Sequence, residues 1–246
     1  MSARFDGKLA LVTGAGSGLG EAIAIKFVAE GARVIAVDLT SPDSLVDRFG
    51  ESVIPWQADV SDADNVRELE EWVRNTYGGL DVLANNAGIG GIQRILHEYP
   101  IDEFDRVVEV NVRGSFLMLQ AAVRLMLGSG GGAVVNTASI ASFRGTPHSS
   151  AYATSKGALV MLTRAAALDY ARHGIRVNAV APGVTRTPIL DTRSTETIAK
   201  LADLIPQGRV GEPADVANVV AFLADDNETA HVTGQVWVVD GGRSAG

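Results

Sequence analysis

The chain contains no cysteine, which excludes disulfide bonds, thiolate nucleophiles and thiolate metal sites. Histidine is also scarce, and the four imidazoles show none of the spacings typical of a metal site. They are His97, His148, His173 and His231. We therefore expect no catalytic metal.

Basic side chains are outnumbered by acidic ones: 21 lysines and arginines face 29 aspartates and glutamates, which gives a formal net charge of −8. Binding a phosphate backbone requires a basic surface, so the composition argues against a nucleic acid as the partner. A small anionic ligand is not excluded, because backbone N–H groups at the start of a helix hold phosphate without basic side chains.

Long hydrophobic runs are missing as well. No stretch approaches the roughly 18 apolar residues of a membrane span, and the segment Met1–Lys8 lacks the apolar centre of a signal peptide. Hydrophobic residues nonetheless make up 46% of the chain, enough to bury a sizeable core. The sequence thus predicts a cytoplasmic protein without membrane contact, folded as a single domain over residues 1–246.

Short apolar runs recur between longer amphipathic segments. Because the runs do not alternate with polar residues, they are typical of strands covered on both faces, as in a parallel sheet. The predicted strands are 9–12, 34–37, 53–58, 80–83, 133–136, 176–180 and 236–239. The predicted helical segments are 21–30, 64–77, 152–172 and 101–127, the last long enough for two helices or one broken helix. This alternation predicts an α/β fold with a doubly wound parallel sheet of the Rossmann type.

A glycine-rich turn, Thr13-Gly-Ala-Gly-Ser-Gly-Leu-Gly20, follows the first predicted strand and opens a helix. Glycines permit a tight turn and the close approach of a pyrophosphate, and the helix start offers free N–H groups. Leu19 stands where the G-x-G-x-x-G pattern has its third glycine, and no Gly-Lys-Ser/Thr follows, which disfavours a nucleoside-triphosphate loop. The turn therefore predicts dinucleotide binding.

Asp38 closes the second predicted strand. A carboxylate at this offset can accept hydrogen bonds from the adenosine ribose, and it would repel a 2′-phosphate. No lysine or arginine lies in 15–17 or 39–41 to attract that phosphate. Asp38 therefore favours NAD over NADP, the alternative being an aspartate that caps a helix or a turn.

Tyr152 and Lys156 are four positions apart in a predicted helix, which places their Cβ atoms about 5–6 Å apart on one face. A phenol ordinarily loses its proton at about pH 10, and a neighbouring cation favours the phenolate. The pair predicts a tyrosine whose pKa is lowered and which can exchange a proton near neutral pH.

Together these motifs resemble the short-chain dehydrogenase/reductase family over about Lys8 to Gly242. The glycine-rich turn matches the cofactor turn of that family, and Asn85-Asn86-Ala87-Gly88 matches its fourth-strand motif. Its catalytic tetrad and its nicotinamide-side loop are matched by Asn111, Ser139, Tyr152, Lys156, Pro182, Gly183 and Thr187.

The resemblance implies a role for each member of the tetrad. Tyr152 would be the general acid in ketone reduction and the general base in alcohol oxidation. Lys156 would lower the pKa of Tyr152 and hold the nicotinamide ribose. Ser139 would donate a hydrogen bond to the substrate oxygen as charge develops there. Asn111 would hold a water that links Lys156 to solvent.

The resemblance also implies a set of cofactor-binding residues along the carboxyl edge of the sheet. They are Gly14, Ser17, Gly18, Leu19, Gly20, Asp38, Leu39, Asp59, Val60, Asn85, Ala87, Gly88, Tyr152, Lys156, Pro182, Gly183, Val184 and Thr187. For Asp59 an ordinary turn aspartate is the alternative, and Asn86 is expected to brace the central strands.

Substrate selectivity is expected to come from the segments after the catalytic strands, and residues 187–207 are expected to form a substrate lid. The bulky side chains of these segments are mostly apolar: Ile140, Phe143, Ile189, Leu190 and Leu204. Those that could meet an anion are Arg144, His148 and Arg193. The pattern favours a neutral, rather apolar ketone or secondary alcohol.

The sequence therefore predicts an NAD-dependent oxidoreductase that interconverts a secondary alcohol and a ketone by hydride transfer. Two alternatives stay open. One is a 3-oxoacyl-thioester reductase of the same family, whose usual NADPH dependence counts against it, and the other is a catalytically silent NAD(H)-binding sensor. The family commonly forms tetramers through its long helices and C-terminal strand, so a homotetramer is expected.

Overall fold

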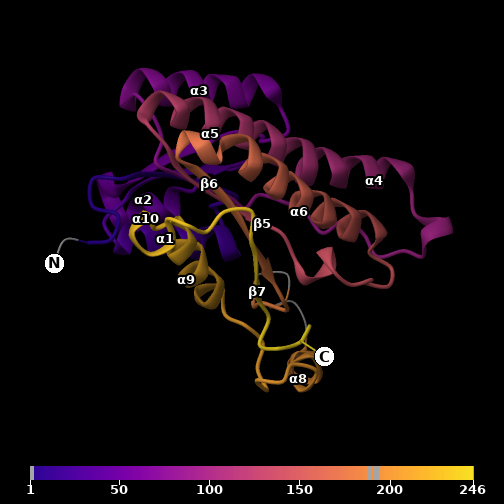
Figure 1. Cartoon of the computed structure of the whole chain (residues 1–246). Coiled ribbons are helices and arrows are strands. Elements are labelled where there is room, and N and C mark those ends of the chain that lie inside the picture. The colour runs from indigo at the N-terminus through magenta and orange to yellow at the C-terminus, as the bar shows by residue number, and fades with distance from the viewer. Residues whose placement is uncertain (1–2, 188–189, 191–193, 246) are drawn as a thin grey trace.

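The structure, a computed structural model, describes residues 3–187, 190 and 194–245. At its centre lies one parallel sheet with the strand order β3-β2-β1-β4-β5-β6-β7 (Figure 1). The strands are β1 (Leu9–Thr13), β2 (Arg33–Asp38), β3 (Val53–Gln57), β4 (Val82–Asn85), β5 (Gly132–Thr137), β6 (Ile175–Pro182) and β7 (Val236–Val239). The predicted doubly wound α/β fold is confirmed.

Helices cover both faces of the sheet (Figure 1). One layer holds α1 (Gly18–Ala29), α2 (Asp43–Phe49) and α9 (Pro213–Ala224), and the other holds α3 (Ala63–Tyr77), α5 (Ser115–Ser129) and α6 (Ser150–Tyr170). Side chains alternate along β1, so Ala10 and Val12 join the core beside α1, whereas Leu9 and Leu11 join the core beside α5. Because both faces are buried, the strands are apolar without alternation.

The strand order reverses between β1 and β4, which pair directly through Val12 and Ala84. In an open α/β sheet such a reversal leaves a crevice outside the carboxyl ends of the strands, where ligands bind. The glycine-rich turn leaves β1 at this edge, Asn86 follows β4, and Ser139 follows β5. The fold therefore brings three of the sequence motifs to one edge of the sheet.

The predicted segment 101–127 is a broken helix. α4 (Ile101–Val108) passes through a π-helical turn, Glu109–Gly114, into α5. Such turns contain an extra residue and are frequent at functional sites. Asn111 lies in this turn and is fully buried. Asparagine is unfavourable inside an α-helix, and here it stands where the helix departs from α geometry.

One long helix, α9, was not predicted from the sequence. Its start has a capping box between Glu212 and Asp215 and a proline, Pro213, in the first turn, and both signals can be read from the sequence. α9 buries Val216 and Val220 in the core that it shares with α1. Two shorter helices are α8 (Thr195–Asp203), inside the predicted lid, and α10 (Asp226–Thr229).

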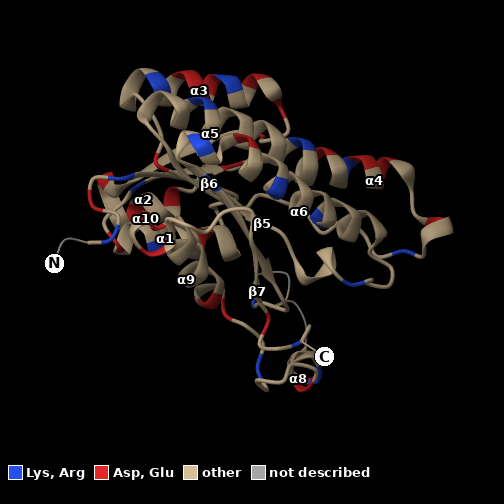
Figure 2. Cartoon of the chain, in the orientation of Figure 1, with Lys and Arg blue, Asp and Glu red and all other residues tan. Residues whose placement is uncertain are grey.

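The outer helices differ in their charge. α3 carries charged positions along its whole length, whereas α6 carries few (Figure 2). Within the described part of the chain, no helix combines the length and the apolar character needed to cross a membrane.

Candidate active site

The glycine-rich turn folds back on itself between β1 and α1. Gly14 and Gly18 have φ angles of 67° and 58°, in the left-handed region that favours glycine. A Cβ on Gly20 would overlap the carbonyl oxygen of Gly14, so the turn can pack against α1 only with glycine there. The N-cap, Ser17, makes no side-chain cap hydrogen bond, which leaves the first N–H groups of α1 open to an anion. A pyrophosphate fits this cradle.

The Asp38 carboxylate lies against the same turn. Its Oδ2 accepts a hydrogen bond of 2.8 Å from the Gly16 N–H. Its Oδ1 accepts no hydrogen bond from any of the described residues, so it is open to the hydroxyls of a ribose. The carboxylate is therefore oriented by the turn that would hold the pyrophosphate.

Thr13 and Asn86 brace the central strands at this edge. Thr13 Oγ1 accepts hydrogen bonds from the N–H groups of Asn86 and Ala87, each 2.9 Å long. The Asn86 amide donates to the Thr13 carbonyl at 3.1 Å, and its Oδ1 accepts from Thr137 Oγ1 at 3.3 Å. The bracing role predicted for Asn86 is confirmed, whereas the part played by the Thr13 hydroxyl was missed.

The side chain of Asn85 points into the protein rather than into the crevice. Its amide donates to the Ser115 carbonyl at 2.9 Å and to Asn136 Oδ1 at 3.0 Å. Asn136 in turn donates to Thr163 Oγ1 at 2.9 Å. Only the backbone of Asn85 is therefore placed to face a cofactor.

Ser139, Tyr152 and Lys156 come together where β5 ends and α6 begins. Ser139 caps a 3₁₀ turn, Ile140–Ser142, and it lies close enough to Tyr152 to act on the pKa of its phenol. Lys156 Nζ lies 5.8 Å from the centroid of the Tyr152 ring and donates to the Thr137 carbonyl at 2.7 Å. The structure thus gathers the three side chains that the sequence predicted to act together.

Asn111 joins this group from the π-helical turn. Its Oδ1 accepts from the Ile89 N–H at 2.7 Å, and its Nδ2 donates to the Ile89 carbonyl and to Ser155 Oγ, both at 2.9 Å. A Cβ on Gly88 would lie 3.0 Å from Asn111 Oδ1 and 3.4 Å from Lys156 Nζ, so glycine lets the chain pass between them. Asn111 therefore fixes the loop after β4 against α6, and its predicted water-holding role stays a prediction.

Burial sets the protonation of both titratable groups. Lys156 is 4% exposed, and loss of hydration lowers its pKa from 10.5 to about 8. Burial raises the pKa of Tyr152, and the hydrogen bond with Ser139 opposes this only in part. The prediction that Lys156 lowers the pKa of Tyr152 is therefore wrong for this structure. The amine of Lys156 holds its own proton less tightly than in water, and it donates to the Thr137 carbonyl rather than to Tyr152.

Asp59 behaves as a turn aspartate. Its Oδ1 accepts from the Ser61 N–H at 2.8 Å and from the Ser61 hydroxyl at 2.6 Å. Val60 is buried and packs beside Gly114 of the π-helical turn. Contact of Asp59 and Val60 with adenine stays a prediction.

The loop after β6 is held by β7 and by the segment before α9. The Gly183 N–H donates to the Val239 carbonyl at 2.9 Å, and a Cβ on Gly183 would meet Asp240. The Val184 carbonyl accepts from the Gly211 N–H at 3.0 Å. These contacts carry the chain from Pro182 to Thr187 along the same edge as the tetrad. The lid predictions for Ile189 and Arg193 lie outside the described residues.

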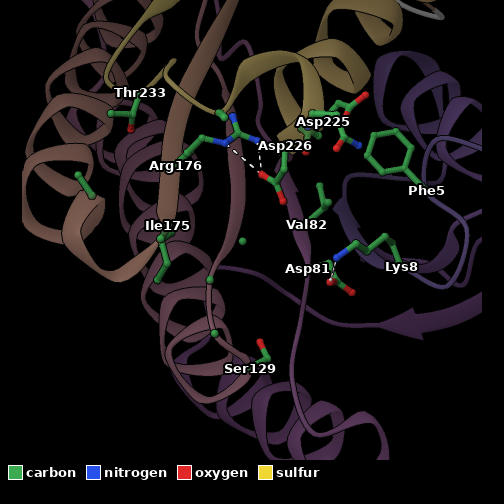
Figure 3. Close-up of a pocket in the computed structure, with 18 of the residues that line it drawn as sticks. Phe5, Lys8, Asp81, Val82, Ser129, Ile175, Arg176, Asp225, Asp226 and Thr233 are labelled. Atoms are coloured by element: carbon green, nitrogen blue, oxygen red, sulfur yellow. Dashed lines mark hydrogen bonds and ion pairs between the residues drawn. The ribbon is translucent and has the colours of Figure 1, made fainter.

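A cavity of about 780 Å³ lies at the opposite edge of the sheet (Figure 3). Its lining includes Lys8, Asp81 and Arg176, which stand at the amino ends of the central strands. The charges there pair with one another, Lys8 with Asp81 and Arg176 with Asp226, each at 2.8 Å. This cavity is therefore remote from Tyr152 and is not the catalytic pocket. No group of three histidine or acidic side chains is placed to bind a metal ion within 3–187, 190 and 194–245.

Comparison with known proteins supports an oxidoreductase. A protein-family model described as enoyl-(acyl carrier protein) reductase matches residues 14–244. The chain is 43% identical to 2-(R)-hydroxypropyl-CoM dehydrogenase of Xanthobacter autotrophicus, over 97% of this chain and 99% of the relative. It is 39% identical to cyclohexanol dehydrogenase of an Acinetobacter species, over 98% of this chain and 96% of the relative.

A solved structure agrees closely with the whole fold. The 3-ketoacyl-(acyl-carrier-protein) reductase from Brucella melitensis, complexed with NADH, matches with a TM-score of 0.91 at 36% identity. The match covers 98% of this chain and 99% of that chain. The likeness therefore extends from the glycine-rich turn to β7.

The lowered pKa of Lys156 predicts a pH-dependent contribution to stability. The folded protein releases this proton at about pH 8 and the unfolded chain at 10.5, so the free energy of unfolding should rise with pH between these values. From pH 8 to 9.5 the gain should be about 2 kcal/mol. Urea unfolding of the cofactor-free protein at several pH values should show this rise, and Lys156→Met should lose it. The exposed Lys200→Met is the matched control and should keep it; parallel curves for wild type and Lys156→Met would contradict the assignment.

Proposed function

The chain belongs to the short-chain dehydrogenase/reductase family, and we propose that it interconverts a secondary alcohol and a ketone with NAD as the hydride carrier. The observation that carries this proposal is the meeting of Ser139, Tyr152 and Lys156 at the carboxyl edge of the sheet. The glycine-rich turn lies at the same edge, across the reversal of strand order. A phenol that exchanges protons beside a dinucleotide cradle is the combination that hydride transfer at an alcohol carbon needs.

In the oxidation direction, the substrate hydroxyl docks between Ser139 and Tyr152. Tyr152, as the phenolate, takes the hydroxyl proton, while the Ser139 hydroxyl donates a hydrogen bond to the same oxygen. When bound, NAD supplies the acceptor for the hydride that leaves the alcohol carbon, and its positive ring favours the phenolate. Lys156, with a pKa of about 8, can release or hold a proton near neutral pH, and in this proposal it passes the proton to solvent through a water held by Asn111. Reduction uses the same groups in reverse.

The cofactor is held, in this proposal, by residues from both sides of the crevice. The pyrophosphate lies on the N–H groups at the start of α1, and Asp38 Oδ1 accepts from the adenosine ribose. Lys156 binds the nicotinamide ribose, and the loop from Pro182 to Thr187 borders the nicotinamide. Asp38 supports NAD rather than NADP because its carboxylate would repel a 2′-phosphate.

The substrate in this proposal is neutral and rather apolar. The exposed Phe143 lies directly after the 3₁₀ turn that Ser139 caps, which supports an apolar wall next to the catalytic hydroxyls. Two of the similar proteins are named as dehydrogenases of alcohols, 2-(R)-hydroxypropyl-CoM and cyclohexanol. These names support a secondary alcohol as the substrate class.

A 3-oxoacyl-thioester reductase is the second candidate. The description of the matching family model names an acyl-carrier-protein reductase, and the similar Brucella melitensis structure is of a 3-ketoacyl-(acyl-carrier-protein) reductase with NADH. A preference for NAD therefore does not separate the two candidates. The bulky side chains of the predicted substrate segments are mostly apolar, which favours the simple alcohol.

One assay separates the candidates. The protein is incubated with NAD⁺ or NADP⁺ and a panel of linear and cyclic secondary alcohols, and with NADH or NADPH and a 3-oxoacyl thioester, while the absorbance of the reduced nicotinamide is followed. Turnover of alcohols with NAD⁺ supports the proposal. Turnover of the thioester alone supports the second candidate, and tight NADH binding without turnover of any compound supports a silent sensor.

We propose that the chain assembles as a homotetramer. Leu168 and Met161 on α6 are 84% and 58% exposed, and Phe116 on α5 is 47% exposed. On the edge strand β7, Trp237 and Val238 are also exposed. Exposed apolar surface of this kind is typical of subunit interfaces. Size-exclusion chromatography with light scattering should give four times the chain mass at micromolar concentration, and Leu168→Glu should lower this mass. A monomeric wild type would refute the assembly.

The cytoplasmic location of the protein stays a prediction from the sequence.

Asp38 should decide the choice of cofactor. Wild type should have a higher kcat/KM with NAD⁺ than with NADP⁺. Asp38→Ala removes a charged acceptor for the ribose, so kcat/KM with NAD⁺ should fall about 10- to 100-fold, while the value with NADP⁺ should not fall. The exposed Asp47→Ala is the matched control and should leave both values unchanged. An NADP⁺ preference in the wild type would overturn the assignment.

Tyr152→Phe should abolish turnover without weakening cofactor binding. The change removes the only hydroxyl placed to exchange the substrate proton in this mechanism, which should lower kcat by about 10²- to 10⁴-fold. The Kd for NADH, measured by nicotinamide fluorescence, should change little. Tyr170→Phe, at the far end of α6, is the matched control. Near-normal kcat in Tyr152→Phe would show that another group transfers the proton.

A further inference from the structure

We propose that Ser142 is a positioning residue that fixes Ser139 relative to Lys156, an inference that rests on the proposed function. Ser142 is the last residue of the 3₁₀ turn after β5. Its Oγ accepts a hydrogen bond of 3.3 Å from the Ser139 N–H and donates one of 2.8 Å to the Lys156 carbonyl. One hydroxyl thus bridges the two segments that carry the catalytic side chains.

The bridge matters because the chain itself connects these segments through a surface loop. Residues 143–148 between the 3₁₀ turn and α6 are all exposed. His148 in this connection has a φ of 62°, which is unusual for a residue other than glycine. The covalent connection is therefore a surface loop, and directional contacts must set the distance between Ser139 and Tyr152.

Lys156 is held at both of its ends. Its Nζ donates to the Thr137 carbonyl on β5, and its backbone carbonyl accepts from Ser142. The first contact orients the amine, and the second fixes the turn of α6 that carries it. Ser142 therefore helps to place α6 against the end of β5, at the turn of the helix that carries Lys156.

The 3₁₀ turn also sets the surroundings of the Ser139 hydroxyl. The turn is a capping box, in which Ser139 Oγ accepts from the Ala141 N–H at 3.2 Å and Ser142 Oγ accepts from the Ser139 N–H. The Ala141 N–H takes one of the two lone pairs of the Ser139 oxygen, and the hydroxyl proton stays available for donation. Donation is what the substrate oxygen requires from it.

The usual partner in a capping box is glutamate or glutamine at the third position. Here a serine takes that place, and its hydroxyl proton is free to reach a second acceptor, the Lys156 carbonyl. A carboxylate at this position could accept from Ser139 but could not donate to α6. A serine at position 142 is therefore explained by its hydrogen bond to the Lys156 carbonyl together with its part in the capping box.

The test compares Ser142→Ala and Ser142→Cys with Ser142→Thr. Alanine has no donor and cysteine only a weak one, whereas threonine keeps the hydroxyl. We expect the first two to lower kcat about tenfold or more, because small misplacements of catalytic groups are costly. The Kd for NADH should stay within about twofold, and the rise of kcat with pH in alcohol oxidation should move to higher pH. Threonine should restore both kcat and the pH profile toward wild type.

Ser129→Ala is the matched control. Its hydroxyl also donates to a helix carbonyl, that of Leu125 at 3.2 Å, but it lies at the opposite edge of the sheet. This variant should keep the wild-type kcat and pH profile, whatever change in melting temperature it shows.

Tyr152→Phe, measured in parallel, separates failure of the Ser142 role from failure of the proposed function. If Tyr152→Phe is inactive while Ser142→Ala and Ser142→Cys keep the wild-type kcat and pH profile, the bridging role is wrong and the proposed function stands. If the wild type turns over no secondary alcohol, the proposed function fails and the role of Ser142 fails with it. If Tyr152→Phe keeps a near-normal kcat, another group transfers the proton, and the role of Ser142 in placing Ser139 beside Tyr152 is wrong. If Ser142→Ala does not fold, the cysteine variant alone decides, since a wild-type kcat there refutes the role and a loss rescued by threonine supports it.

Discussion

The burial of the Lys156 amine is the constraint around which this site is built. Removing an ammonium from water costs on the order of several kcal/mol unless hydrogen bonds replace the hydration. Here the Thr137 carbonyl provides the replacement, and the residual cost appears as a pKa lowered to about 8. The neighbouring segments approach closely here: a Cβ on Gly88 would lie 3.0 Å from Asn111 Oδ1, and the buried Asn111 donates to Ser155 Oγ on α6.

Hydrogen bonds between buried polar side chains also run through the centre of the sheet. Asn85 on β4, Asn136 on β5 and Thr163 on α6 form a buried chain that links strands to helices across the molecule. Buried networks of this kind are strong because the surroundings have a low dielectric constant, and they permit one arrangement only. The two apolar cores supply cohesion, while the polar chain and the Ser142 bridge set how α6 lies against β5.

Much of the fold and of the site could be predicted from the sequence, and the exceptions have physical causes. The strands were found because burial on both faces leaves an unbroken apolar run, and Tyr152 and Lys156 because helical spacing places them on one face. Ser142 and the Thr137 carbonyl were missed, since contacts between β5 and α6 depend on how these elements pack. The pKa of Tyr152 was predicted in the wrong direction, because spacing shows a neighbouring cation but not the loss of hydration. The helix α9 was missed although its capping signals are present at Glu212 and Pro213.

The π-helical turn between α4 and α5 accommodates one extra residue inside a long helical segment. In an α-helix one residue corresponds to a rotation of about 100°, and the wider turn takes up that rotation locally. α5 can therefore still direct Met118 and Leu125 into the core. Deletion of a single residue within Glu109–Gly114 should convert the turn to regular α geometry and leave the later part of α5 in place. The cost of such a deletion would then fall on the buried Asn111, whose position depends on the wide turn, and not on the hydrophobic face of α5.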